Sequence, residues 1–434
     1  MVAKGVQMKK FITYILSSAL LFTPSISVFA QENNLQNQTL TLEDCINLTL
    51  QNNPEIAASY SNQEAQRSQL KQSKSNYFPQ VNGSAGYSRS NANNAAGNTG
   101  TSNNYSASVN ASQLIYDFGQ TSSTVGIQEK SYQSAVQNTN ALINDKIYAL
   151  KVAYYAVLSA EESANVYKQS VEQYTEQLKR AQAFYEVGTY PKIDVTSAQV
   201  NLNDAKLNLL TAQNLVKTKR QELLNIMGIT DANPTFTLQM ANALPPFELT
   251  LEEALQTANK NRPDLLAKQL QVESARQNVT LSKTGYAPTL TANGSYAWSG
   301  NDFPLYDRWS AGASLNVPIF SGFSTYNKVE QSKQNLQTAY HNLTSLEQQI
   351  LLDVKTAYLS LNNARERIPV AELTKKQAKE SYDLAVGRYK VGVGNYIEVK
   401  DAETSYSKAK LSYIQAVLDY NLAVAKLQNS MGSR

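Results

Sequence analysis

Two copies of one unit make up most of the chain, and this duplication constrains the fold more than any other feature of the sequence. The matching segments follow in the same order in both copies: Leu40-Thr-Leu-Glu-Asp44 and Leu249-Thr-Leu-Glu-Glu253, Asn53-Pro-Glu55 and Arg262-Pro-Asp264, Tyr77-Phe-Pro79 and Tyr286-Ala-Pro288, Tyr185-Glu-Val-Gly188 and Tyr389-Lys-Val-Gly392, and Ile193-Asp-Val195 and Ile397-Glu-Val399. A repeat of this kind predicts one supersecondary unit built twice. We place the first repeat over residues 31–228, a linker over 229–248 and the second repeat over 249–434.

Each repeat begins with helical sequence. Residues 41–44 read Thr-x-x-Asp and residues 250–253 read Thr-x-x-Glu, and both patterns are typical of a capping box at a helix N-terminus. Helical sequence then continues to a proline, Pro79 in the first copy and Pro288 in the second.

The later part of each repeat predicts a helical hairpin of unusual length. Long helices are expected over about 120–187 and about 324–391, the second interrupted only by Pro369. At ~1.5 Å per residue each would be on the order of 100 Å long. After a glycine turn, return helices are expected over about 193–227 and about 397–431. Apolar residues on the first return helix spread over more than one stripe, as in a helix with a neighbour on each side.

Between the two helical parts, each repeat contains a pair of segments that alternate between apolar and small polar residues. These segments predict strands over about 80–89, 105–116, 289–299 and 309–320. Each has roughly the length of a tilted transmembrane strand. The apolar face is expected to contact lipid, and the Ser- and Asn-rich face is expected to contact water in a lumen.

Four aromatic residues lie near the loop ends of these strands, where a membrane-interface girdle is expected: Tyr87, Tyr105, Trp298 and Trp309. The polar segment Ser90–Asn104 separates the first two strands. Its position favours an exposed hairpin loop, and a disordered linker is the alternative.

Four strands cannot close a barrel around water, and an open sheet in lipid would leave backbone groups unsatisfied at its edges. The chains are therefore expected to pool their strands. Three chains would supply twelve strands, and a single barrel of that size can enclose a channel.

The N-terminus has the features of a secretory signal peptide over residues 1–30. Lys9 and Lys10 precede an apolar run, and Val28-Phe-Ala30 fits a cleavage site. An uncleaved membrane anchor is the alternative, and the start residue could be Met1 or Met8. Beyond this segment no run of ~20 apolar residues predicts a transmembrane helix.

Composition and chemistry point away from an enzyme. Lys4, Lys9 and Lys10 supply three of the four net positive charges. The rest of the sequence is nearly neutral and gives no indication of nucleic-acid binding. His341 is the sole histidine and lies in a polar helical stretch, which excludes a His-based triad or a His-rich metal site. Cys45, the only cysteine, allows no intrachain disulfide and fits a small residue on an amphipathic helix. We expect no catalytic site, no metal site and no cofactor.

The tips of the two long hairpins read "YEVGTYPKIDV" and "YKVGVGNYIEV". With the duplication and the order of helices and strands, they give nearly the whole mature chain a pattern that resembles the TolC-like outer-membrane efflux protein family. The resemblance implies a mixed α+β membrane protein, a trimeric channel-tunnel with a shared twelve-stranded β-barrel and a long periplasmic α-helical barrel. It also implies work with a periplasmic adaptor protein and an inner-membrane transporter, in the outer membrane of a Gram-negative bacterium.

Two groups of site residues follow from the resemblance, which for the second group covers Asp383, with Glu380 added by its spacing on the helix. Adaptor hairpins are expected to dock beside the tips: Val187, Gly188, Thr189, Val391, Gly392 and Val393. Glu380 and Asp383 share a helix face and form a candidate acidic gate that would favour cations. The alternatives are that the glycines only reverse the chain and that the two acids are ordinary solvated charges. Arg388 and Lys390 could instead hold the tip closed.

These observations favour a passive export channel that conducts small molecules such as drugs and toxic compounds from the inner-membrane pump to the outside. The same fold serving type I protein secretion is the first alternative. A secreted, soluble coiled-coil structural protein is a more distant one, because it leaves the four alternating strands unexplained.

Overall fold

A computed structural model of the chain describes residues 38–93, 99–189, 191–230, 235–239 and 248–433. The signal peptide expected over residues 1–30, with both candidate start residues, lies outside this part of the chain. The chain divides into two compact units: Leu40–Thr230 with Leu238–Arg434 forms the larger, and Met1–Thr39 with Asp231–Thr237 the smaller. A two-stranded sheet pairs β1 (Gln38–Leu40) with β4 (Phe236–Leu238), and the sequence analysis did not predict it.

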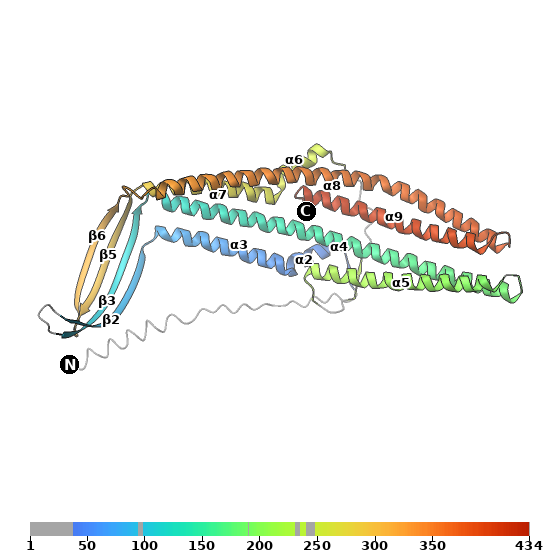
Figure 1. Ribbon diagram of the computed structural model, residues 1–434, viewed down its shortest axis with the longest axis horizontal. Helices are drawn as coiled ribbons and strands as arrows, with labels where there is room; N and C mark the ends of the chain where they lie inside the picture. Colours follow the sequence, from blue (N-terminus) through green and yellow to red (C-terminus); the bar gives the residue numbers. More distant parts are fainter. Residues whose placement is uncertain (1–37, 94–98, 190, 231–234, 240–247, 434) are drawn as a thin grey trace. The chain divides into compact units, whose positions relative to one another are not determined.

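In the larger unit the same order of elements occurs twice (Figure 1). The first series comprises α2 (Leu42–Asn52), α3 (Pro54–Ser73), the 3-10 turn η1 (Lys74–Tyr77), β2 (Gln80–Asn93), β3 (Thr99–Tyr116), α4 (Gln120–Glu186) and α5 (Lys192–Met227). The second comprises α6 (Leu251–Asn261), α7 (Pro263–Lys283), η2 (Thr284–Tyr286), β5 (Thr289–Gly300), β6 (Tyr306–Asn316), α8 (Ser324–Lys390) and α9 (Tyr396–Ser430).

Both capping boxes are present. The Thr41 hydroxyl accepts from the Asp44 amide at 3.1 Å, and the Asp44 carboxylate accepts from the Thr41 amide at 3.0 Å. The corresponding bonds between Thr250 and Glu253 measure 3.3 and 2.9 Å. The helical stretch that follows is broken in both copies, because a proline opens α3 and α7 and the residue before a proline avoids helical geometry.

The four longer strands form one antiparallel sheet in the order β2-β3-β5-β6. Its register confirms the expected faces. Tyr87 lies opposite Tyr105, Val109 opposite Tyr296, and Tyr296 opposite Trp309. Across the other face Ser84 and Ser108 share a hydrogen bond of 2.9 Å. The sheet therefore has one aromatic and aliphatic face and one face rich in Ser and Asn.

The strand bounds correct two expectations. Most of the segment expected as a loop over Ser90–Asn104 is strand: Ser90 pairs with Ser102, and the ladder ends at Asn93 and Thr99, with residues 94–98 outside the description. This polar segment can form strand because the β-ladder is held by backbone hydrogen bonds, which do not depend on the polarity of the side chains. The last strand, expected over 309–320, begins at Tyr306 and ends at Asn316. Pro318, with its fixed φ and missing N–H, follows that end.

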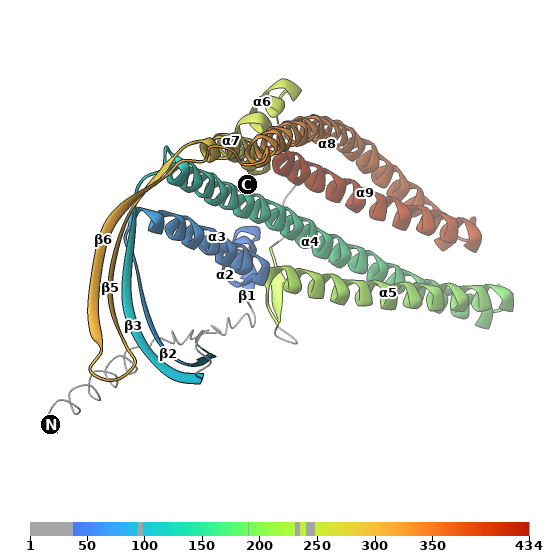
Figure 2. The ribbon, with the colours of Figure 1, turned by 60° about the vertical axis from the view of Figure 1, so that its left-hand side comes forward.

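The two long helices, α4 and α8, each span 67 residues. They leave the sheet at one end and reach the hairpin tips at the other (Figures 1 and 2). The expected interruption at Pro369 is absent, because α8 continues through that residue. The helix α4 packs against α2, α3, α5, α7 and α9, while α8 packs against α6, α7 and α9. None of the helices in the described part of the chain is both long and apolar enough to cross a membrane.

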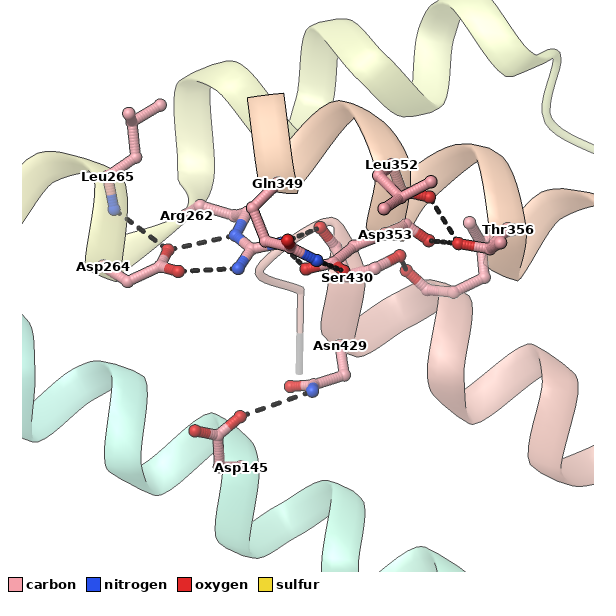
Figure 3. Close-up of polar contacts among 11 residues, drawn as sticks. Asp145, Arg262, Asp264, Leu265, Gln349, Leu352, Asp353, Thr356, Asn429 and Ser430 are labelled. Carbon is pink, nitrogen blue, oxygen red and sulfur yellow. Dashed lines mark hydrogen bonds and ion pairs between the residues drawn. The ribbon is translucent and has the colours of Figure 1, made fainter. Parts of the chain in front are cut away.

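A polar junction fixes the break between α6 and α7 (Figure 3). The Arg262 guanidinium donates to both Asp264 oxygens at 3.0 and 2.6 Å, and to the Ser430 carbonyl at 3.2 Å. It also lies 3.4 Å from Asp353 on α8. At the matching place in the first copy, Asn53 donates to the Ile226 carbonyl at 2.8 Å. Each copy thus anchors the end of its return helix to its own helix break.

Candidate functional site

The two hairpin tips close in the same way. At the first tip, Gly188 has φ +77°, and the Thr189 amide donates to the Phe184 carbonyl at 2.9 Å. At the second, Gly392 has φ +78°, and the Val393 amide donates to the Arg388 carbonyl at 3.1 Å. Left-handed glycines that satisfy the last carbonyls of a helix are typical C-terminal caps. The backbone therefore explains both glycines without a partner.

The side chains around the glycines face outward. Val187, Val391 and Val393 are 74%, 73% and 68% exposed. A Cβ at Gly188 or Gly392 would meet no other atom within 4 Å. Each tip is thus an open bend at the end of a helical hairpin, with exposed valine side chains beside its glycine.

Below the tips an apolar cluster joins the two hairpins. Ala181 of α4 and Ala198 of α5 pack with Tyr389, Tyr396 and Val399 of the second hairpin, and all five are buried. Asn201 of α5 donates to the Tyr396 hydroxyl at 2.7 Å. The sequence marked the tips but did not reveal this contact between the repeats.

Beside this cluster lies a hollow of about 440 Å³ between α4 and α8. Its lining is polar on the α4 side, with Gln173 and Arg180, and more apolar on the α8 side, with Tyr382 and Val386. Two of its lining residues, Tyr389 and Val399, also belong to the buried cluster that joins the hairpins.

A buried carboxyl group lies further along the contact between α4 and α9. Glu403 is 1% exposed, and its Oε1 accepts from the Ser170 and Ser407 hydroxyls at 3.1 and 2.9 Å. The Gln173 carboxamide nitrogen, oriented by its hydrogen bonds, donates to both carboxyl oxygens at 2.7 Å. Burial raises the pKa of Glu403, and the Ser407 and Ser170 hydroxyls and the charge of Lys410 oppose that rise. The sequence analysis missed this group.

The two acids of the candidate gate are exposed on α8. Asp383 forms an ion pair with Lys379, one helical turn away, at 2.7 Å. The acidic charge is therefore partly compensated within α8, which the spacing of Glu380 and Asp383 alone did not indicate. Arg388 lies 3.7 Å from Glu398 of α9, an ion pair across the second hairpin.

The four aromatic residues of the expected girdle lie on one face of the sheet. Tyr87 and Tyr105 lie inside their strands and not near the loop end, because the β2–β3 ladder continues past them to Asn93 and Thr99. Tyr87 and Tyr105 have ring centroids 4.9 Å apart, and Trp298 packs on Tyr296 at 4.7 Å. Trp309 lies opposite Tyr296 in the register and is 75% exposed.

A second aromatic set, which the sequence analysis missed, lies where the sheet meets the helices. Its exposed members are Tyr77, Phe78, Tyr116, Phe118, Tyr286, Phe320 and Phe323. Pairs such as Tyr116 with Phe118 at 4.6 Å and Phe320 with Phe323 at 5.7 Å show that the rings gather there. The sequence signal was present, because each pair brackets the end of an alternating segment.

The remaining reactive side chains offer no second site. Cys45 is fully buried, and burial raises its pKa to about 12, so the thiol is inert at neutral pH. His341 is exposed on α8. Among the residues that the structure describes, no group of three or more His, Cys, Asp or Glu side chains is arranged to hold a metal ion.

The sequence profile of the family "Outer membrane efflux protein" matches residues 45–229 and 254–433, one match for each series of elements. The chain belongs to the outer membrane efflux protein family. As such it is an outer-membrane channel for efflux, located in the outer membrane of a Gram-negative bacterium.

Similar proteins include the outer membrane protein TolC of Vibrio cholerae, 24% identical over 436 residues, covering 98% of this chain and 96% of TolC. The outer membrane efflux protein BepC of Brucella suis is 24% identical and covers 90% of this chain and 85% of its own.

Among solved structures, the CmeC outer membrane channel of Campylobacter jejuni superposes with a TM-score of 0.81 at 20% identity, covering 90% of this chain and 85% of CmeC. The MtrE channel of Neisseria gonorrhoeae, in its open state, gives 0.76 at 20% identity over 90% and 89%. The resemblance inferred from the tips and the repeat is thereby confirmed at the level of family and fold.

Proposed function

We propose that this outer membrane efflux protein is a passive export duct built from three copies of the chain. A twelve-stranded β-barrel would cross the membrane, and the paired long helices would form a tube on its periplasmic side. The observation that carries the proposal is the four-stranded sheet with one apolar face, one polar face and two unpaired edges. Such a sheet is complete in lipid only when its edges are paired by other copies.

The helices support the same oligomer. A row of apolar residues along α5 and another along α8 remain more than half exposed: Ile193, Val200, Leu207 and Leu210, and Leu352, Leu359, Val370 and Leu373. Several are seven residues apart, the spacing of a coiled-coil seam. Packing α5 of one copy against α8 of the next would bury both rows and close a ring of helices.

The aromatic residues fit a barrel in a bilayer. Tyr87, Tyr105, Trp298 and Trp309 would lie at the outer interface, and the set at the strand–helix junctions at the periplasmic one. Tyr and Trp favour the boundary between hydrocarbon and headgroups.

The exposed tips are the proposed contact for a periplasmic adaptor, which would couple the duct to an inner-membrane transporter. Energy would come from the transporter, since the channel itself carries no catalytic constellation in the sequence. Docking at Val187–Thr189 and Val391–Val393 would separate the hairpins and open the tube. The duct would then release small molecules such as drugs and toxic compounds outside the cell.

The tips can be tested by adding bulk without altering the fold. Gly188→Trp and Gly392→Trp place a side chain in open space, so trimers should still form, at a modest cost from the positive φ. We expect both variants to lose most efflux, measured as a drop in the minimum inhibitory concentration of exported drugs. A matched control is Gln256→Trp, an exposed position on α6 away from both tips and from the apolar rows of α5 and α8. Normal resistance in both tip variants would refute the docking proposal.

The acidic gate remains a proposal as well. In a trimer Glu380 and Asp383 would place six carboxylates around one axis, enough to favour cations. Replacing both by alanine should lower the cation preference of single channels and free Lys379 from its ion pair. Unchanged conductance and unchanged ion preference would show that the two acids are only solvated surface charges.

One similar protein is named outer membrane protein TolC, and another is named an antibiotic efflux pump outer membrane protein. These names favour small-molecule export over a dedicated protein-secretion role. The soluble coiled-coil alternative is set aside, because membership of an outer-membrane family accounts for the strands that it left unexplained.

A further inference from the structure

The charged residues of the sheet lie only on its two edge strands. As bounded by the structure, the four strands contain three such residues: Arg89 on β2, and Asp307 and Arg308 on β6. The interior strands β3 and β5 have none. Since β2 and β6 are also the strands with an edge left unpaired by the described residues, the charges lie where another copy would meet them.

The register places Arg89 and Asp307 on the same face. Arg89 pairs with Asn103, and Asp307 pairs with Trp298, which pairs with Ala107. Because side chains alternate along a strand, Asn103 and Ala107 share a face, and so do Arg89 and Asp307. It is the apolar face. Arg308 lies on the other face, where it donates to the Ser299 hydroxyl at 3.0 Å.

Neither charge on the apolar face has a counter-charge among the residues that the structure describes. Arg89 is exposed and forms no ion pair with any residue that the structure describes. Asp307 accepts from the Tyr296 hydroxyl at 2.9 Å but forms no ion pair within the described ranges. A charge on the lipid face is destabilising, most of all at the bilayer midplane and less near the interface, so a partner of opposite sign would be favoured.

Barrel closure brings the two charges to one level. For about twelve strands tilted by ~35–45°, with ~3.3 Å per residue and ~4.8 Å between strands, each copy is staggered by about four to six residues. Only an even stagger preserves the faces. The same direction of stagger is present within one chain. Following the paired residues across the sheet from Gln80, the first residue of β2, leads to Gly312 on β6, four residues before β6 ends at Asn316.

If each copy is shifted by about four residues in this direction, Arg89 of one copy lies opposite Asp307 of its neighbour. If the shift is about six residues, Arg89 lies opposite Trp309 and diagonal to Asp307. Both arrangements allow contact, because a long side chain reaches a diagonal neighbour. In the second, the guanidinium would also lie over the Trp309 ring, an attractive cation–π geometry.

We infer that Arg89 of one copy forms an ion pair with Asp307 of the next across the β2–β6 seam, and that this pair fixes the register in which the barrel closes. The inference rests on the proposed trimer and adds its interface residues. A one-residue slip would send Arg89 and Asp307 to opposite faces, so the pair selects against the wrong register as well as stabilising the right one.

Cross-linking tests the seam directly. In the full-length protein, Arg89→Cys with Asp307→Cys should give covalent dimers and trimers when purified trimers are treated with a short bifunctional thiol reagent. The native Cys45 is buried and gives a low background. The control pairs Arg89→Cys with Arg308→Cys, which lies on the opposite face and should stay unlinked. Trimers that show no link, or equal linking in the control, would overturn the inference but leave the proposed function standing; absence of any trimer would remove both.

Charge reversal tests the ion pair itself. Arg89→Asp or Asp307→Arg alone should lower the temperature at which SDS-resistant trimers dissociate by several degrees, and the combined swap should restore most of the loss. If Arg89 binds a lipid phosphate instead, Arg89→Asp lowers that temperature and the swap gives no recovery, which contradicts the proposed pair.

Discussion

At the scale of single residues, the same sequence signal has two structural meanings. Gly188 at a tip and Gly228 at the end of α5 both follow a helix and have φ values of +77° and +72°. Around Gly188 there is open space, whereas a Cβ on Gly228 would lie 2.4 Å from the Asn52 carbonyl oxygen. Gly432 is equally crowded, with Arg262 Cα at 2.8 Å. One glycine reverses an exposed chain, and the other two also permit close packing.

This difference predicts unequal costs for one substitution. Gly188→Ala should lower the free energy of unfolding by about 1 kcal/mol, the strain of a left-handed non-glycine residue. Gly228→Ala adds a backbone clash at the junction of α2 and α3, so it should cost about 3 kcal/mol or more. Thermal unfolding of the two extracted variants measures the difference. Equal costs would mean that the junction yields freely, contrary to its packing.

At the scale of elements, much of the fold follows from local patterns. The capping boxes, the long helices and the two faces of the sheet depend on residues a few positions apart, so the sequence predicts them. The ladder beyond Tyr87 does not follow, because Ser90–Asn93 has low strand propensity and gains its hydrogen bonds from Thr99–Ser102. At Pro369 the sequence predicted an interruption that the structure lacks. The proline removes one backbone donor, but packing along the rest of α8 keeps the helix continuous.

Site contacts between distant elements were equally hidden. Ser170 donates a hydrogen bond to Glu403, 233 positions away in the sequence. The apolar cluster below the tips likewise joins residues that are far apart in the sequence. No periodicity encodes such a pair. The tips themselves were visible because their turn residues are local and occur twice.

Glu403 predicts a pH dependence of the contact between α4 and α9. Burial raises its pKa above the ordinary value of 4.5, so the packed state holds the proton more tightly than a state in which the helices have separated. The contribution of Glu403 to stability is then fully present below about pH 4.5 and is lost as pH rises through the raised pKa. We expect Glu403→Gln to flatten this decline, as measured by the unfolding midpoint of the extracted protein between about pH 4.5 and about pH 8.

The control for this prediction is Glu172→Gln, which removes an exposed carboxyl from the hollow beside the same helices. It should retain the wild-type profile. A Glu403→Gln profile identical to wild type would show that the buried carboxyl does not control the contact.

At the scale of the whole molecule, a single chain leaves apolar surface exposed and strand edges unpaired. Its sheet has an apolar face and two free edges, and its helices α5 and α8 carry exposed apolar rows. The hairpin tips point away from the sheet, at the far ends of α4 and α8 (Figure 1). A trimer would pair the edges, bury the rows and leave the tips free for a partner. Substrate choice is then expected at the transporter, because the polar face of the sheet is nearly uncharged.

The central claim is that three copies make one transmembrane duct, and single-channel recording of the purified protein in planar lipid bilayers tests it most directly. The detergent-extracted protein should run as an SDS-resistant trimer and insert as one conducting unit per trimer, with discrete and reproducible conductance steps. A soluble monomer that produces no conductance at any protein concentration would contradict the account.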